Sequence, residues 1–224
     1  MEREYKRNIK QRKDINPISL KHIYISIMAY IMDEEKWFQD LPRSSVAEPL
    51  SDATIDESSP EAVQEWFQNL HLHSKPKLTK LHFFVHDNVT ATNPTAVLVA
   101  PADAPSIAST QFGSTYAMDD PITVSSDPSS KTIGRAQGTF TFVSQTDPVL
   151  SMSVKLVFTE GKYKDSTLTI MGNNPISRKY REMPILGGTG AFRLARGIAT
   201  VNTVTVDIAK LNDILEYNVI LQHY

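Results

Sequence analysis

The most constraining feature of this sequence is a series of short apolar runs with a period of two, which begins near Leu78 and continues to the C-terminus. Alternation of this kind places successive side chains on opposite faces of a β-strand. We therefore predict strands at residues 81–87, 95–100, 112–118, 138–144, 150–160, 166–172, 192–207 and 214–224. Clusters of Asp, Asn, Gly and Pro between the runs predict turns at 119–121, 126–128, 147–148, 161 and 173–175. The run 192–207 fits either two strands or one strand bent at Gly197.

Many short strands without intervening helical patterns favour an antiparallel β-barrel or sandwich over a parallel α/β sheet. The composition excludes several kinds of function. A net charge of −2 offers no field that would attract nucleic acid. The absence of cysteine excludes disulfides and thiolate metal sites, and the six histidines are scattered, so we predict no metal site.

The first 76 residues differ in kind from the rest of the chain and form a predicted N-terminal extension, poorly ordered or partly helical. Residues 21–32 contain a short apolar run after a basic segment, which is compatible with a degraded secretory leader or with a plain amphipathic helix. That run is too short to span a bilayer. Residues 33–76 are acidic and rich in proline and serine, as linkers are. Within them, Ser59 and Pro60 predict the N-cap and first position of a short helix.

A cluster of glycines stands at Gly187, Gly188, Gly190 and Gly197, with Arg181 shortly before it. Glycines beside arginine suggest a phosphate site, but a dinucleotide fingerprint needs a different spacing and a following helix. The residues after the cluster are strand formers. A tight structural turn is therefore the favoured interpretation.

The same glycine segment also carries a family resemblance. The chain contains, in order, HFFVHDN at 82–88, MDDPIT at 118–123, GRAQGTF at 134–140, FTEGKYKDSTLTIMG at 158–172, REMPILGGTGAF at 181–192 and EYNVILQHY at 216–224. Together these motifs resemble the dirigent protein family of land plants. The resemblance covers residues 78–224 and is strongest to the subgroup that includes pterocarpan-forming members.

The resemblance implies that residues 77–224 form an eight-stranded antiparallel up-and-down β-barrel, assembled as a homotrimer or homodimer. It implies a small phenolic substrate, no cofactor, and a separate oxidase or reductase that supplies a reactive radical or quinone methide. It also implies secretion to the apoplast. The sequon at Asn88, Asn-Val-Thr, is the acceptable glycosylation site of the chain and agrees with secretion.

Asp87 is the first candidate catalytic residue. By alternation it shares a strand face with Phe83 and Val85, so it is a carboxyl group at the end of an apolar face. The residues alone favour an acid that caps a turn in solvent. The resemblance instead implies a cavity aspartate that helps proton transfer, with Phe83 as a neighbouring substrate-binding residue.

Arg181 is the second candidate catalytic residue, because a guanidinium group binds phenolate or carboxylate oxygens through a fixed fork of donors. The alternative is a surface ion pair with Glu182 or Asp165. Asn174 and Phe140 are predicted substrate-binding residues. Lignan-coupling members of the family have an aspartate and a tyrosine at these two positions, so the resemblance disfavours monolignol coupling here. Asp119 and Asp120 are predicted to form a turn before Pro121.

Three functions follow from these observations. The leading one is a dirigent protein that orients the coupling or cyclisation of phenylpropanoid-derived radicals or quinone methides, without oxidase activity of its own. The second is a pterocarpan-synthase-like dehydratase acting on an isoflavanol. The third is a non-catalytic ligand-binding barrel in plant defence. Two incubations distinguish them, one with an oxidase and a monolignol and one with an isoflavanol. The chirality of the product is measured in each.

Overall fold

The computed structural model describes residues 59–73, 75–90, 92–102, 110–207 and 212–224. The predicted leader at 21–32 lies outside the described residues. So does the part of the predicted linker 33–76 that ends at residue 58. The elements in chain order are α3 (Pro60–His73), β1 (Lys77–Asn88), β2 (Ala96–Ala100), β3 (Thr115–Thr123), β4 (Thr132–Phe142), β5 (Val149–Phe158), η3 (Gly161–Tyr163), β6 (Thr167–Pro175), β7 (Tyr180–Thr189), η4 (Gly190–Phe192), β8 (Arg196–Asp207) and β9 (Asn212–His223).

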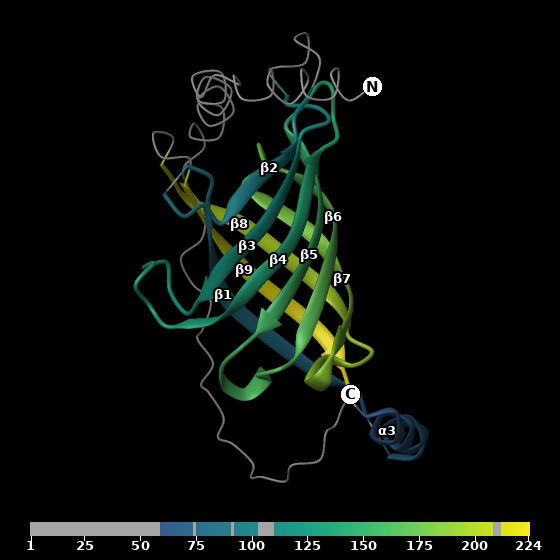
Figure 1. Ribbon diagram of the computed structural model, residues 1–224. Helices are drawn as coiled ribbons and strands as arrows, with labels where there is room; N and C mark the ends of the chain where they lie inside the picture. Colours follow the sequence, from purple (N-terminus) through teal and green to yellow (C-terminus); the bar gives the residue numbers. More distant parts are fainter. Residues whose placement is uncertain (1–58, 74, 91, 103–109, 208–211) are drawn as a thin grey trace, which may run out of the picture.

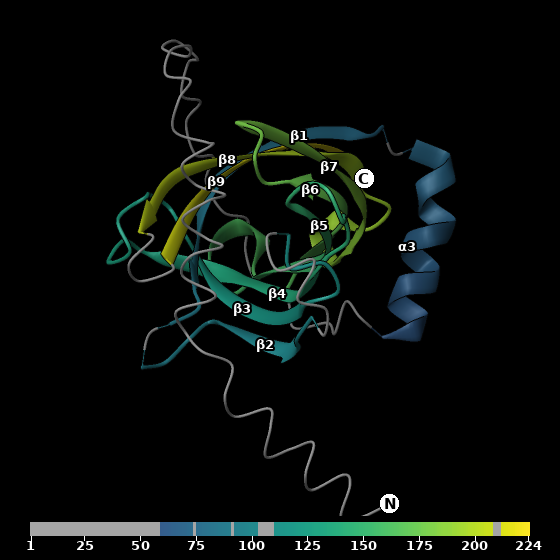
Figure 2. The same cartoon turned by 90° about the horizontal axis from the view of Figure 1, so that it is seen from above.

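Eight of the strands close into an antiparallel barrel, which confirms the predicted fold (Figure 1). Each strand from β3 to β9 pairs with the next one in sequence, β1 pairs with β9, and β1 also pairs with β3 to complete the ring. Closure matters because it leaves the ring without an open sheet edge. Figure 2, which looks along the barrel, shows β2 on the outside of this ring next to β3.

The junction between β1 and β3 is interrupted, and this interruption lies beside the candidate site. Near Val85 and Ile122 the two strands are paired, but further along β1 the neighbour of β3 is β2. The start of β2 is held on both sides, because the Thr95 N–H donates to the Asn88 carbonyl and the Thr95 carbonyl accepts from the Asp119 N–H, each at 2.8 Å. Strand β2 therefore pairs with β3 along the part of β3 that β1 does not reach.

The helix α3 begins as the sequence predicts. The Ala62 N–H donates to the Ser59 hydroxyl at 3.1 Å, which is a side-chain N-cap, and Pro60 occupies the first helical position. The helix stands outside the barrel (Figure 2), where the Arg193 guanidinium lies 5.2 Å from the centre of the Trp66 ring. Among the described residues, no helix is sufficiently long and apolar to traverse a bilayer.

The two ends of the barrel differ, and we name them by their contents. The packed end holds η3, η4 and the C-terminus, at the bottom of Figure 1. Its centre is an aromatic cluster around the fully buried Phe192, whose ring lies 4.6 Å from Tyr163, 5.4 Å from His223 and 5.6 Å from Phe158. Such a cluster excludes water from half of the lumen. The cavity end is the opposite one, where the β4–β5 and β6–β7 connections lie.

The glycine cluster forms a structural turn at the packed end, as predicted. Gly190 has a φ of +60°, and a Cβ there would lie 2.6 Å from the Ser166 hydroxyl. A Cβ on Gly188 would come within 2.5 Å of the Thr167 carbonyl oxygen. The fold of the turn thus accounts for both glycines. Since Arg181 stands at the start of β7 and the turn at its end, the arginine and the glycines occupy opposite ends of the barrel.

The predicted turns at 119–121 and 173–175 are wrong, because these residues continue β3 and β6. Pro121 is tolerated there for a local reason. On the β1/β2 side it falls between Met118, which pairs with β2, and Ile122, which pairs with β1. A missing N–H is least harmful where the strand has no continuous ladder on that side. Uninterrupted alternation then turns Asp120 into the barrel.

Candidate functional site

A lumenal cavity occupies the cavity end of the barrel. Tyr116 and Phe140 form one wall, with their rings stacked at 4.9 Å, and the Tyr116 hydroxyl donates to the Gln111 side-chain oxygen at 3.2 Å. The polar groups that also line the cavity are Asp87, Asp120, Asn174, Arg181, Thr203, Asp213 and Tyr217. An aromatic wall with a few converging polar groups is typical of small-molecule sites. The volume of the cavity is only about 100 Å³. A polycyclic ligand therefore fits only if lining side chains move outward.

Asp87 lies in this cavity near the end of β1. Burial, together with the negative charge of Asp213, raises the pKa of its carboxyl group to about 7. Its Oδ1 atom is closed off from solvent and accepts no hydrogen bond. A carboxyl group that holds its proton near neutral pH is suited to general acid catalysis.

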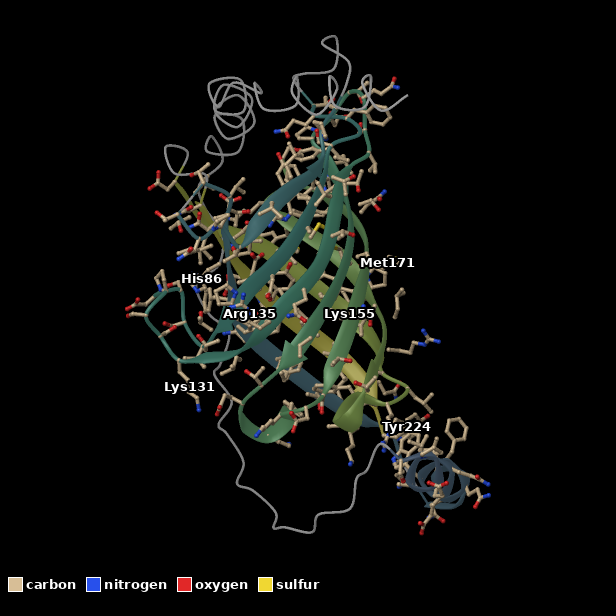
Figure 3. The ribbon with its side chains drawn as sticks, in the orientation of Figure 1. His86, Lys131, Arg135, Lys155, Met171 and Tyr224 are labelled. Atoms are coloured by element: carbon tan, nitrogen blue, oxygen red, sulfur yellow. The ribbon has the colours of Figure 1, made fainter. Side chains whose placement is uncertain are left out.

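Asp120 is a second acid of the cavity. The side chain is fully buried, and the Thr95 side chain is the group whose hydrogen bond favours the ionised carboxylate. Burial and the nearby charge of Asp87 raise the pKa of this carboxyl group to about 9. Its neighbour Asp119 faces outward, where Arg135 on the outer surface (Figure 3) donates to its carboxylate at 2.8 Å and lowers its pKa. The pKa of Asp120 is thus raised and the pKa of Asp119 is lowered, although the two residues are adjacent on one strand.

Arg181 provides the positive charge of the cavity. Its side chain is only 2% exposed, and its Nη1 donates to the Thr203 hydroxyl at 2.8 Å. Within the part of the chain that the structure describes, the Nε and Nη2 atoms have no partner, although a buried guanidinium normally has all its donors satisfied. Burial lowers the pKa of Arg181, while Tyr217 and Asp213 oppose that change. A cavity-lining guanidinium therefore has two donors that a ligand oxygen could satisfy.

The structure brings most of the predicted site residues together. Asp87 and Arg181 line the same cavity, as do Asn174 and Phe140. Asn174 is buried, and its side-chain oxygen has no partner. Phe83 lies outside the lining: its ring stacks at 5.4 Å on Tyr217 and contacts the cavity only through that residue. The catalytic and binding roles of these residues stay predictions.

A second hollow, which we call the outer hollow, lies where the β3–β4 loop meets the ends of β1 and β8 and the start of β9. It measures about 320 Å³ and is lined by parts of β1, β8, β9 and the β3–β4 loop, with Asp87, Asn88 and Asp213 among its residues. His86 also borders it, at the base of the β3–β4 loop (Figure 3), with its Nε2 atom 2.7 Å from the Thr123 hydroxyl. Asp87 therefore borders both the lumenal cavity and the outer hollow.

Sequence reasoning missed Asp120, Asp213, Tyr116 and Tyr217, although a signal for each existed. Tyr116 and Asp120 share the inward face of β3, but the Asp-Asp-Pro motif was interpreted as a turn. Asp213 and Tyr217 share the inward face of β9, but the predicted strand begins two residues after β9 does, at 214, and so leaves Asp213 outside it. In the part of the chain that the structure describes, no group of His, Cys, Asp and Glu has the geometry of a metal site.

Comparison with known proteins agrees with this architecture. Residues 78–222 match the model of the family described as Dirigent-like protein. The chain belongs to the dirigent family. Dirigent protein 21 of Arabidopsis thaliana is 44% identical over 151 residues, covering 67% of this chain and 80% of that protein. Pterocarpan synthase 1 of Glycine max is 44% identical over 149 residues, covering 66% and 80%.

Solved structures of dirigent proteins share the barrel. The pterocarpan synthase dirigent protein GePTS1 superposes with a TM-score of 0.62 and 42% identity, covering 68% of this chain and 88% of that one. A second pterocarpan synthase dirigent protein, PsPTS1, gives a TM-score of 0.63 and 39% identity, covering 68% and 99%. These similarities connect this dirigent barrel with proteins that make pterocarpans.

Proposed function

We propose that this dirigent protein binds a phenolic benzylic alcohol of the isoflavanol type and directs its dehydrative ring closure. One observation supports the proposal above the others: an acid that retains its proton near pH 7 and a guanidinium with two unpaired donors line the same cavity. The similarity to pterocarpan synthases supports the choice of substrate class.

The proposed reaction uses these groups in sequence. Asp87 donates its proton to the benzylic hydroxyl, the carbon–oxygen bond breaks, and water leaves. A phenolic oxygen of the same molecule then bonds to that carbon, and its proton returns to the Asp87 carboxylate, so that the acid is regenerated. Arg181 binds a second phenolic oxygen of the substrate and favours its ionised form. This phenolate donates electrons towards the benzylic carbon as water leaves, so that a neutral quinone methide forms. Attack by the closing phenol returns the electron pair to the phenolate oxygen. The stacked rings of Tyr116 and Phe140 support the planar substrate.

Asp87→Asn tests the acid directly. Asparagine preserves the shape of the side chain but cannot donate a carboxyl proton, so the rate of product formation should fall by about 10²–10⁴-fold. Arg181→Lys retains a charge but loses the fork of donors, and should change the enantiomeric ratio of the product. Chiral chromatography and thermal melts on the same two variants give the measurement.

The control separates chemistry from folding. A structural role for the two residues predicts a lowered melting temperature together with an unaltered enantiomeric ratio, and that pattern would contradict the proposal. Incubation of the wild-type protein with an oxidase and a monolignol tests the other dirigent activity. A chiral lignan from that reaction, with no turnover of an isoflavanol, would replace the proposed dehydration by directed radical coupling.

We also propose that the protein is secreted and glycosylated at Asn88. The support is the sequon together with the position of Asn88 at the end of β1, beside the outer hollow. A homotrimer is proposed on the family resemblance and agrees with apolar side chains on the outer wall, among them Met171, Ile198 and Ile220. Glycosidase treatment and light scattering of the protein purified from plant cells test the two proposals.

A further inference from the structure

Three carboxyl groups form a row across the wall of the barrel at the level of the cavity. Asp87 on β1 is the direct cross-strand partner of Asp213 on β9. On the other side, Asp120 of β3 lies across the junction where β2 begins, and it is close enough to Asp87 for the charge of Asp87 to raise its pKa. All three line the lumenal cavity. We call Asp120, Asp87 and Asp213 the carboxyl row.

The row cannot hold three negative charges. Side chains directly opposite on antiparallel strands have Cβ atoms about 4.5–5.5 Å apart, and like charges at that separation destabilise the sheet. Neighbouring buried carboxyl groups therefore retain protons instead of all ionising. The groups that face Asp87 from the surrounding strands are Asp213 and Tyr217 of β9, Asp120 and Tyr116 of β3, and Arg181 of β7. Of these, only Arg181 is cationic.

The position of Arg181 indicates which acid is ionised. Its guanidinium reaches the Thr203 hydroxyl, and Thr203 pairs with Leu215, which is one inward position from Asp213 on β9. Asp213 is also an acid whose charge favours the charged form of Arg181. The positive charge of Arg181 favours the anion of Asp213 in turn, because the interaction is mutual. The negative charge then remains at one end of the row.

We propose that Asp213 is the positioning residue of the site: its carboxylate, held ionised by Arg181, keeps the reactive proton on Asp87 and orients it. The inference deepens the proposed function, since it assigns the group that prepares the acid. When Asp87 gives its proton to the leaving hydroxyl, its new charge stands opposite that of Asp213. This repulsion favours return of a proton to Asp87, either from the closing phenol or from water in the outer hollow, which both residues border.

The test compares two variants of the full chain that each remove one negative charge. Asp213→Asn removes the charge of the carboxyl row. Asp207→Asn is the matched control, because Asp207 borders the outer hollow at the end of β8 but does not line the lumenal cavity. Titration of the aspartate side-chain carbons by ¹³C nuclear magnetic resonance, with the Asp87 signal assigned through Asp87→Asn, follows the proton directly.

Asp213→Asn should move the titration midpoint of Asp87 to lower pH by about one unit or more, because the repulsion is gone while the burial stays. Asp207→Asn should leave the midpoint in place, and Asp213→Glu should retain most of the wild-type value because it preserves the charge. In an isoflavanol assay, the pH above which activity falls should move down with the midpoint in Asp213→Asn. If Asp213→Asn does not fold, Asp213→Ala replaces it in the same titration.

An unchanged Asp87 midpoint in a folded Asp213→Asn or Asp213→Ala protein would overturn the inference. An equal shift in Asp207→Asn would overturn it too, since the effect would then be one of general charge. The proposed function fails separately. If the midpoint shifts as expected but no isoflavanol is turned over, the coupling between Asp213 and Asp87 is supported and the proposed reaction is wrong.

Discussion

The two halves of the barrel lumen are built by the same strands but follow opposite rules. At the packed end, aromatic rings such as Phe158, Tyr163 and Phe192 contact one another and exclude water. At the cavity end, Asn174 and Arg181 are also buried, yet both have polar atoms without a partner among the described residues. Unpaired buried polar groups cost stability. The packed half therefore supplies stability that offsets the unpaired polar groups of the cavity half.

The largest expected effect is on the packed end. Phe192→Ala removes the central ring of the aromatic cluster and should lower the free energy of unfolding by roughly 3–5 kcal/mol, because the surrounding rings cannot collapse into the hole. The melting temperature should fall by on the order of 10 °C. Phe140→Ala is the matched substitution at the cavity end, where a hollow already exists. Its melting temperature should fall less, while ligand binding weakens. Equal thermal losses in the two variants would remove the distinction between the halves.

An intermediate effect, of the opposite sign, is expected at the cavity end. The pKa of Asp120 is about 9 in the folded protein, raised by burial from an ordinary value of 3.8. The free energy of unfolding therefore falls as pH rises from about 4 to about 9, where the unfolded chain ionises this group and the folded protein does not. Asp120→Asn has no proton to lose and should be more stable than wild type at pH 8, by roughly 2 kcal/mol or more.

Thermal melts between pH 4 and pH 9 check this sign. The advantage of Asp120→Asn should shrink towards zero near pH 4. Asp119→Asn is the control, because it removes the outward neighbour and its bond to Arg135, and should give no gain at any pH. A stabilisation that is the same at pH 4 and pH 8 would show that Asp120 is not the source of the pH dependence.

The smallest effect is expected from removal of the N-terminal extension. A chain that starts at Lys77, where β1 begins, keeps both halves of the lumen and loses the contact between Arg193 and Trp66. Such a cation–π contact stabilises by about 0.5–1 kcal/mol at an exposed site. Circular dichroism should therefore retain its β-type spectrum, and the melting temperature should change by only a few degrees. Loss of cooperative unfolding would show that the extension belongs to the barrel.

Much of the packed half follows from sequence alone. Period-two alternation predicts which side chains of β5 and β9 point inward, and Gly190 marks a turn that only a residue without a Cβ can make. The helix start at Ser59 is equally local, because N-capping depends on residues three apart. These features need no knowledge of which strands are neighbours.

The cavity half is harder to predict because its residues meet only when the ring closes. The family resemblance points to Asp87 and Arg181, whereas the residues alone favour an acid at Asp87 that caps a turn in solvent. Asp120 beside Pro121 has the local pattern of a turn, so its burial depends on the change of strand neighbour at that point. Asp213 becomes informative only once the register of β1 and β9 places it opposite Asp87. No local pattern contains that register.

The interrupted junction of β1 and β3 has a mechanical consequence. A closed barrel resists expansion through the pairing between neighbouring strands, so the two strands with the fewest residue pairs separate most easily. Here β1 and β3 share two residue pairs, whereas β1 and β9 share a ladder from Lys77 to Asn88. An occupant too large for the hollow would strain the wall along this seam first, and the seam runs beside the carboxyl row. The barrel is thus most compliant where its acids are, so the space around the reacting group can adapt while the packed end stays rigid.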